Sequence, residues 1–85
     1  MTRSALTESY ASVLKQLRIL REARGVSQVE LARRLGRTQP FVSYIERGER
    51  RIDVVEFCAI CRAMDLDPTE IFAQVVAELP PILSI

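Results

Sequence analysis

A repeated signal for starting helices is the sequence feature that most constrains this chain. Residues 27–30 and 53–56 each carry a capping residue followed three positions later by glutamate, a pattern in which each side chain accepts a hydrogen bond from the other residue's backbone N–H. A third start lies at residues 67–68, where proline follows a capping aspartate and takes the favoured first helical position. Helix stops are expected at Gly25, Gly36 and Gly48, because glycine adopts the left-handed backbone that ends a helix. These signals divide the chain into five helical segments.

Apolar residues recur at helical spacing within each segment, and no segment shows the alternation of a strand. We therefore expect an all-α protein, with helices at about 8–24, 27–36, 38–48, 53–64 and 67–79, capping residues included. The expected buried stripe of the fourth helix is Val54, Phe57, Ile60, Cys61 and Met64. The apolar side of the fifth helix is Ile71, Phe72, Val75, Val76 and Leu79. A chain of 85 residues supports one domain, 1–85, whose core we expect within residues 10–79.

Charge is divided unevenly along the chain, although the net charge is only +1. Residues 13–51 contain ten Lys and Arg against four Glu, whereas residues 52–85 contain one Arg against six Asp and Glu. A protein with one side facing a polyanion shows such a division. A charge run is also common on a solvated helix face, so charge alone leaves both interpretations open.

Several kinds of site are disfavoured by what the sequence lacks. It has no histidine and only two cysteines, Cys58 and Cys61, so one chain does not supply the four Cys or His ligands of a usual zinc site. We expect both cysteines to pack in the core, and we expect no metal and no cofactor. No Ser–His or Cys–His pair, no plausible pair of carboxylates and no glycine-rich phosphate loop is present, so we expect no enzymatic activity.

Neither a membrane segment nor a secretion signal is expected. No apolar run approaches the roughly 18–20 residues that span a bilayer. Residues 1–10 are polar and lack the apolar core of a signal peptide. We therefore expect a cytoplasmic protein.

The second and third helices are both short, and only Gly36 and Arg37 separate them. Two short helices joined by a tight, glycine-containing turn have the spacing of a helix-turn-helix. Ala32 is small at the point where such helices cross closely, and basic residues concentrate around this unit, as phosphate binding requires. The sequence therefore predicts a helix-turn-helix in the second and third helices.

Two motifs carry a resemblance to a known family: R-G-V-S-Q-x-E-L-A at residues 24–32 and V-S-Y-I-E-R-G-E-R at residues 42–50. In this order and at this spacing they resemble the phage-repressor and Cro-like helix-turn-helix regulators of the XRE family. The similar stretch covers residues 17–68. The resemblance implies a compact five-helix, lambda-repressor-like domain that binds double-stranded DNA as a nucleoid-associated transcriptional regulator. Pro40 and Phe41 depart from the polar residues often found at these positions, so the family's base-contact rules do not transfer directly.

The resemblance also implies roles for particular residues of the third helix. This helix would meet base edges and flanking phosphates through Thr38, Gln39, Ser43 and Tyr44. Gln39 is the favoured base-reading residue, because a glutamine amide pairs bidentately with adenine. Phe41 is a candidate for contact with a thymine methyl group, and Gln28 would hydrogen-bond a phosphate and support the recognition helix.

The arginines are expected in three roles. Those expected to neutralise phosphates are Arg37, Arg47, Arg50 and Arg51. Arg21 and Glu46 occupy positions that imply a partly buried ion pair, which orients the recognition helix and contributes little net stability. Those expected to be solvated on the surface are Arg18, Arg24, Arg33 and Arg34.

A homodimer is the expected assembly. One recognition helix reads only about four or five base pairs, so proteins of this kind bind pseudo-palindromic operators as two-fold dimers, with half-sites about 34 Å apart. Residues 68–85, the C-terminal helix and tail, contain more apolar side chains than one small core absorbs, so we expect the dimer surface there. We expect no second, ligand-sensing domain, and a repressor or autoregulator controlled by its own concentration or by a partner protein.

Two alternatives stay open. An antitoxin with the same fold would bind a toxin protein as its main partner and DNA only secondarily. RNA binding is less favoured, because the aromatic residues are few and are not interleaved with the basic ones as stacking platforms require.

Overall fold

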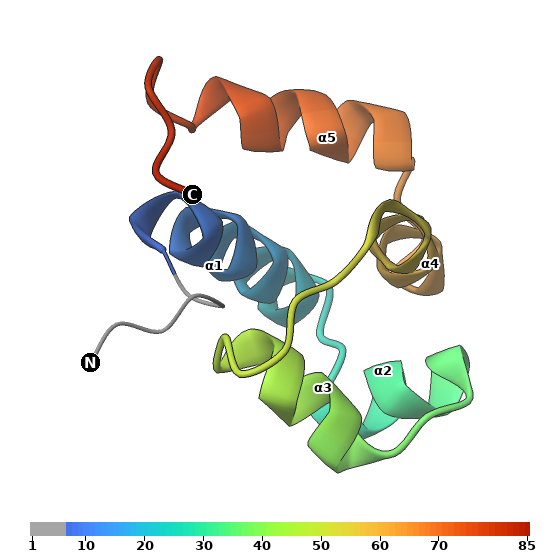
Figure 1. Ribbon diagram of the computed structural model, residues 1–85. Helices are drawn as coiled ribbons and strands as arrows, with labels where there is room; N and C mark the ends of the chain where they lie inside the picture. The colour runs from blue at the N-terminus through green and yellow to red at the C-terminus, as the bar shows by residue number, and fades with distance from the viewer. Residues whose placement is uncertain (1–6) are drawn as a thin grey trace.

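The computed structural model describes residues 7–85 as a small bundle of α-helices (Figure 1). The helices are α1 (Glu8–Ala23), α2 (Gln28–Leu35), α3 (Gln39–Glu46), α4 (Val54–Ala63) and α5 (Pro68–Ala77). No strand occurs in residues 7–85, so the expected all-α class and the five helices are confirmed. Residues 1–6, which form part of the segment expected to lack a signal-peptide core, lie outside the described residues.

The helices lie on two sides of α1 (Figure 1). The short helices α2 and α3 pack against each other on one side, and α5 crosses the opposite side, with α4 at the edge between them. After α5 the chain turns back toward the start of α1, where the Ser84 backbone N–H donates to Ser9 Oγ at 3.1 Å. The helix-turn-helix unit and the C-terminal helix therefore occupy different sides of the molecule.

The helix starts largely follow the expected caps. At α4 both halves of the capping box form: Asp53 Oδ1 accepts from the Glu56 backbone N–H at 2.7 Å, and Glu56 Oε1 accepts from the Asp53 N–H at 2.9 Å. At α2 only half of the expected box forms. Ser27 Oγ accepts from the Glu30 N–H at 3.0 Å, but the Glu30 carboxylate turns to Arg33 and Arg34. Three hydrogen bonds from two guanidinium groups outweigh one from a backbone N–H, so the reciprocal box expected at residues 27–30 was wrong in this half.

The core joins all five helices through two neighbouring clusters. The larger cluster comprises Leu14, Val26, Leu31, Ala32, Val42, Ile45, Ile60 and Met64, and the smaller one Leu17, Cys61, Ile71 and Val75. Ala32 is almost completely buried, which agrees with the expectation that a small residue stands where α2 and α3 cross. Burial of this apolar surface supplies the main driving force for folding.

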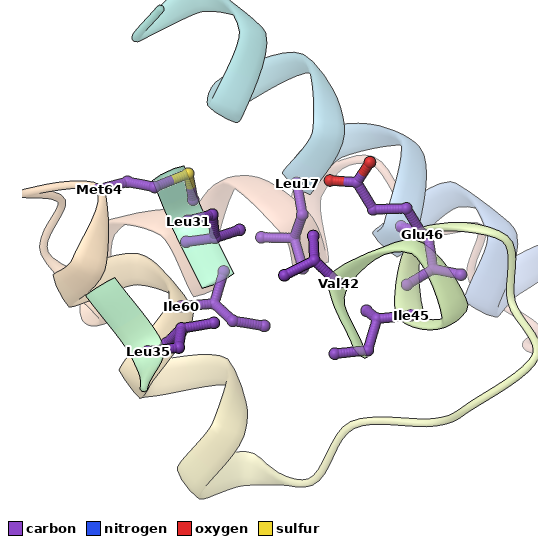
Figure 2. A pocket seen from close by; sticks show the side chains of 9 residues that line it. Leu17, Leu31, Leu35, Val42, Ile45, Glu46, Ile60 and Met64 are labelled. Carbon is purple, nitrogen blue, oxygen red and sulfur yellow. The ribbon is translucent and has the colours of Figure 1, made fainter. Parts of the chain in front are cut away.

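The larger cluster encloses a cavity of about 20 Å³, with room for about one water molecule (Figure 2). Figure 2 shows apolar side chains from α1, α2, α3 and α4 converging on it, including Leu31, Val42 and Ile60. Glu46 stands at the rim and directs its carboxylate toward α1. The cavity is too small for a small-molecule effector.

The buried stripe of α4 is narrower than expected, and part of the apolar side of α5 is exposed. Val54, expected in the core, is the first residue of α4 and is 79% exposed. Phe72 is 58% exposed and Val76 about half exposed, since each lies one position around the helix from the buried residues Ile71 and Val75. The two helices therefore leave an apolar face on the surface.

Both cysteines lie in α4, and neither forms a disulfide. Cys61 is fully buried, and burial raises the pKa of its thiol to about 11, so the thiol is a protonated packing group. Within residues 7–85 no three His, Cys, Asp or Glu side chains are grouped as metal ligands.

None of the helices in the described part of the chain has the length and hydropathy needed to cross a membrane.

Candidate nucleic-acid interface

The turn between α2 and α3 sets the direction of α3. Gly36 ends α2 with φ near 69°, in the left-handed region where glycine carries no Cβ penalty. The Arg37 backbone N–H then donates to the Ala32 carbonyl at 2.9 Å, which closes the turn. Thr38 is the N-cap of α3, and Pro40 stands in the first turn, where its missing N–H costs no helical hydrogen bond.

Helix α3 buries one face and exposes the other. Val42 and Ile45 enter the core, whereas Thr38 and Gln39 are exposed, Tyr44 is about half exposed and Ser43 is half-buried. No side-chain bond caps the helix from Thr38, so its hydroxyl is available to an outside partner. Of the polar residues expected to meet DNA, Thr38, Gln39 and Tyr44 are thus accessible to an outside partner, and Ser43 is partly accessible.

Four side chains form a hydrogen-bonded chain from α1 to the start of α3. Arg21 donates from Nε to Glu46 Oε2 at 2.7 Å and from Nη2 to Glu46 Oε1 at 3.0 Å. Gln28 Nε2 donates to Glu46 Oε1 at 2.8 Å, and Gln39 Nε2 donates to Gln28 Oε1 at 2.8 Å. Arg21 is only 8% exposed and also donates to the Val26 carbonyl at 2.7 Å. The ion pair and the two glutamines therefore form one connected network.

This network leaves Gln39 with the atoms that adenine requires. One amide N–H of Gln39 is used by Gln28, which leaves its second N–H as a donor and its carbonyl oxygen as an acceptor. Adenine presents an acceptor and a donor in the major groove, and an amide in a fixed orientation matches both. Gln28, with both ends of its amide engaged, keeps one side-chain N–H and its backbone N–H at the start of α2 for a phosphate.

The four arginines expected at phosphates differ in their partners. Arg47 forms an ion pair with Glu49 at 3.1 Å and lies over the Tyr44 ring, and Arg50 forms a bidentate pair with Glu56 at 2.8 and 3.1 Å. Two more lie over aromatic rings: the Cζ atom of Arg37 is 4.2 Å from the centroid of Phe41, and that of Arg51 is 4.5 Å from the centroid of Tyr10. Phe41 is half-buried and packs against the core.

Sequence reasoning missed the partners that hold these arginines. Tyr10 accepts a hydrogen bond from the Ile52 backbone N–H at 3.0 Å and supports the ring contact with Arg51. Glu56 was expected only as a cap, yet its carboxylate also binds Arg50. The capping pattern identifies Glu56, but no local signal in the sequence points to its second partner.

Two of the arginines expected to be solvated hold the end of α4. Arg24 Nε donates to the Met64 carbonyl at 3.0 Å, and Arg34 Nη1 donates to the Ala63 carbonyl at 2.8 Å. Cations at the carboxyl end of a helix satisfy its free carbonyls and interact favourably with its dipole. Both residues are exposed, as expected, and each also holds a carbonyl at the end of α4.

Ion pairs shift two carboxyl groups near the interface. Hydrogen bonds from Arg33 and then Arg34 lower the pKa of Glu30 to about 2. The hydrogen bond from Arg50, followed by that from the Asp53 backbone, lowers the pKa of Glu56, and the Glu56 bond in turn raises the pKa of Arg50. These groups stay charged at neutral pH.

Known proteins are similar to this chain in sequence and in fold. Residues 15–73 match the model of a helix-turn-helix domain family. An XRE-family like protein from Pseudomonas syringae pv. tomato is 44% identical, over 85% of this chain and 88% of that one, with a TM-score of 0.79. The restriction-modification controller protein C.AhdI from Aeromonas hydrophila is 33% identical, over 78% of this chain and 100% of that one, with a TM-score of 0.70.

A curated relative is longer. The uncharacterized HTH-type transcriptional regulator y4dL of Sinorhizobium fredii is 42% identical over 55 residues, which are 65% of this chain. The match spans only 28% of that regulator's length.

Proposed function

The chain belongs to the helix-turn-helix domain family and, within it, to the XRE-type regulators, and from this premise we propose that it recognises a specific double-stranded DNA sequence to regulate transcription. In this proposal α3 lies in the major groove, and Gln39 reads an adenine. The protein acts as a dimeric repressor or autoregulator on a pseudo-palindromic operator.

The observation that carries the proposal is the hydrogen-bonded chain from Arg21 through Glu46 and Gln28 to Gln39. It fixes the Gln39 amide before DNA arrives, so binding does not have to order a free side chain. A glutamine held in this way at an exposed helix start has no evident role in stabilising the core. Its orientation favours recognition of a base edge.

The surrounding charges support a DNA-facing surface. Arg37 is exposed at the turn before α3, and Arg47 and Arg51 are exposed in the segment that follows it. Guanidinium groups on both sides of a recognition helix match the two phosphate backbones that border a major groove. Their contacts fix position and orientation, while α3 supplies sequence preference.

The apolar face of α4 and α5 supports dimerisation. Phe57 and Phe72 pack edge to face with ring centroids 5.9 Å apart, and Val54 and Val76 lie beside them in a groove of about 230 Å³. Phe72 and Val54 are mostly exposed. A second copy of this face would remove such surface from water, and α5 lies on the opposite side of α1 from α3, so the dimer leaves α3 accessible (Figure 1). The tail, residues 80–85, extends the proposed surface.

Selection from a pool of random duplexes, at two salt concentrations, tests the proposed function. The expected result is a pseudo-palindrome with half-sites about 34 Å apart, one DNA turn. Weak binding that depends on salt and shows no sequence preference would contradict it. That outcome would favour a protein partner, such as the toxin of an antitoxin pair, as the main ligand.

A further inference from the structure

Phe41 stands at a position where the resembled family often has a polar residue, and two guanidinium groups lie over its ring. The Cζ atom of Arg37 is 4.2 Å from the ring centroid, and that of Arg50 is 4.8 Å from it. Both distances lie within the range of about 6 Å in which a cation is attracted to the face of a ring. The ring therefore contacts one arginine from the turn before α3 and one from the segment after α3.

The two arginines differ in what else they bind. Arg50 is bidentate to Glu56 and also donates to the Arg51 carbonyl at 3.0 Å, so its donors are largely used within the protein. Among residues 7–85 the Arg37 guanidinium forms no hydrogen bond and no salt bridge. It lies over the Phe41 ring, and it borders the same groove as Glu56, whose carboxyl pKa its charge helps to lower. Its hydrogen-bond donors remain available to an outside anion.

The Phe41 ring is itself held firmly. It is half-buried, packs against the larger core cluster and borders a groove of about 140 Å³ with Leu35, Ala59 and Ile60. Arg50 is fixed over it by Glu56, whose carboxylate also completes the capping box of α4. The position of the ring is thus set by the core and by the start of α4.

We propose that Phe41 is a positioning residue that holds the Arg37 guanidinium beside the start of α3, ready to bind a DNA phosphate, and that it does not read a base. The inference rests on the proposed DNA-binding function. A long arginine side chain loses rotamer freedom when it binds a ligand. The ring contact restricts Arg37 before DNA arrives and so reduces this loss on binding.

A double-mutant cycle tests the inference through the affinity for DNA. The variants are Arg37→Ala, Phe41→Leu and the double variant, with Arg62→Ala as a control that removes the same charge from the exposed side of α4. The probes are an alternating A·T duplex and a G·C-rich duplex, each of about 20 base pairs, or two DNA turns. Binding is measured over a series of salt concentrations, because phosphate contacts determine the salt dependence.

The association constant for DNA falls as the salt concentration rises. On a plot of its logarithm against the logarithm of the salt concentration, we expect the slope of Arg37→Ala to be shallower by about 0.9, the value for one lost phosphate contact. Phe41→Leu should weaken binding to both duplexes by about two- to fivefold, the range of an exposed cation–π contact. It should add no further loss in the Arg37→Ala background. Phe41→Tyr keeps the ring and should bind as the wild type does, and Arg62→Ala should leave the affinity nearly unchanged.

Additive effects of Phe41→Leu and Arg37→Ala would overturn the inference, as would a loss confined to one duplex, which indicates base reading. If Phe41→Leu does not fold, Phe41→Met replaces it in the cycle. In the DNA-free protein the Arg37 side-chain protons should show a ring-current shift in the NMR spectrum, and unshifted protons would also overturn the inference. A wild type that binds neither duplex overturns the proposed function as well, whereas normal wild-type binding with an additive cycle overturns only the role of Phe41.

Discussion

At the scale of single residues, the DNA-facing side chains differ in how firmly the protein holds them. Gln39 is fixed by Gln28, and Gln28 by Glu46, whereas the Thr38 hydroxyl and the Arg37 guanidinium keep free donors. A fixed amide suits base recognition, because the match between donor and acceptor depends on orientation. Phosphate oxygens accept hydrogen bonds from many directions, so a phosphate tolerates a donor side chain whose orientation is less strictly fixed.

Variants of Arg21 should separate its effect on the free energy of unfolding from its effect on DNA sequence preference. Arg21→Met leaves Glu46 poorly solvated without its bidentate partner, and we expect a loss of about 2–3 kcal/mol in the free energy of unfolding, below the cost for a fully buried pair. The double variant Arg21→Met/Glu46→Leu removes both charges and should regain much of that stability, while DNA preference stays impaired because Gln28 has lost its acceptor. Urea unfolding and duplex titration measure the two quantities. A double variant with normal preference would show that the network does not orient Gln39.

Glu30 should make stability sensitive to acid. Its pKa in the folded protein is about 2, against 4.5 without the arginine partners, so the folded state favours the carboxylate. The stabilisation is fully present above about pH 4.5 and is lost as the pH falls toward 2. In Glu30→Gln the loss of stability across this interval should be smaller than in the wild type, while Glu78→Gln serves as a control. Thermal unfolding between neutral pH and pH 2 measures this loss of stability. Identical pH profiles for Glu30→Gln and the wild type would contradict a lowered pKa for Glu30.

At the scale of helices, both ends of α4 are capped, but by different means. Its start is capped locally by Asp53 and Glu56, and its end is held from a distance by Arg24 and Arg34. Asp53→Ala should lower the free energy of unfolding by about 1 kcal/mol, because it leaves an N-terminal amide without an acceptor. Thr69→Ala, at an exposed position in α5, is the matched control. A chemical unfolding curve for Asp53→Ala that overlays the wild type would argue against the cap as a contributor to stability.

The number and limits of the helices could be predicted because caps and glycine stops act within a few residues. The cap at residues 53–56 formed as expected for this reason. Contacts between distant segments were not predictable, since Arg34 binds a carbonyl 29 positions away. The competition between two kinds of partner was not predictable either: the Glu30 carboxylate binds Arg33 and Arg34 in place of the backbone N–H at the helix start. Helical spacing identifies an apolar stripe, but which half of the stripe is covered depends on how neighbouring helices cross, so Val54 was wrongly expected in the core.

Of the candidate site, the resemblance supplied the residues but not their connections. The adjacency of Gln28 and Gln39 arises because the turn at Gly36 folds α3 back against α2, and nothing in the local sequence reports the distance between their amides. The contacts of Phe41 could not be predicted from the sequence either, since Arg37 precedes α3 and Arg50 follows it.

At the scale of the whole molecule, opposite sides carry different chemistry. The helix-turn-helix side holds the exposed Arg37, Arg47 and Arg51, whereas α4 and α5 present an apolar face within the acidic part of the chain. Asp53 lines the groove on that face, and a carboxylate beside apolar side chains favours a partner protein over DNA as the occupant. This division allows two copies to associate without covering either recognition helix.

The dimer proposal predicts the effect of a charge on that face. Phe72→Glu should raise the dissociation constant of the dimer at least about tenfold, equivalent to about 1.4 kcal/mol, because a carboxylate would be buried in an apolar interface. Val55→Glu places the same charge on α4 at an exposed valine that does not line the groove, and it should leave the dimer intact. Sedimentation at micromolar concentrations measures both. A wild type that sediments as a monomer would contradict the proposed assembly.

The central claim, that Gln39 is held in place to read an adenine, is tested most directly by repeating the duplex selection with Gln39→Ala. We expect the operator selected by the wild type to lose its preference at one base pair in each half-site, with a loss of about 1–3 kcal/mol in discrimination there and little change elsewhere. Gln74→Ala, at an exposed position on α5, should select the wild-type operator. An unchanged operator for Gln39→Ala would show that the oriented amide does not read a base.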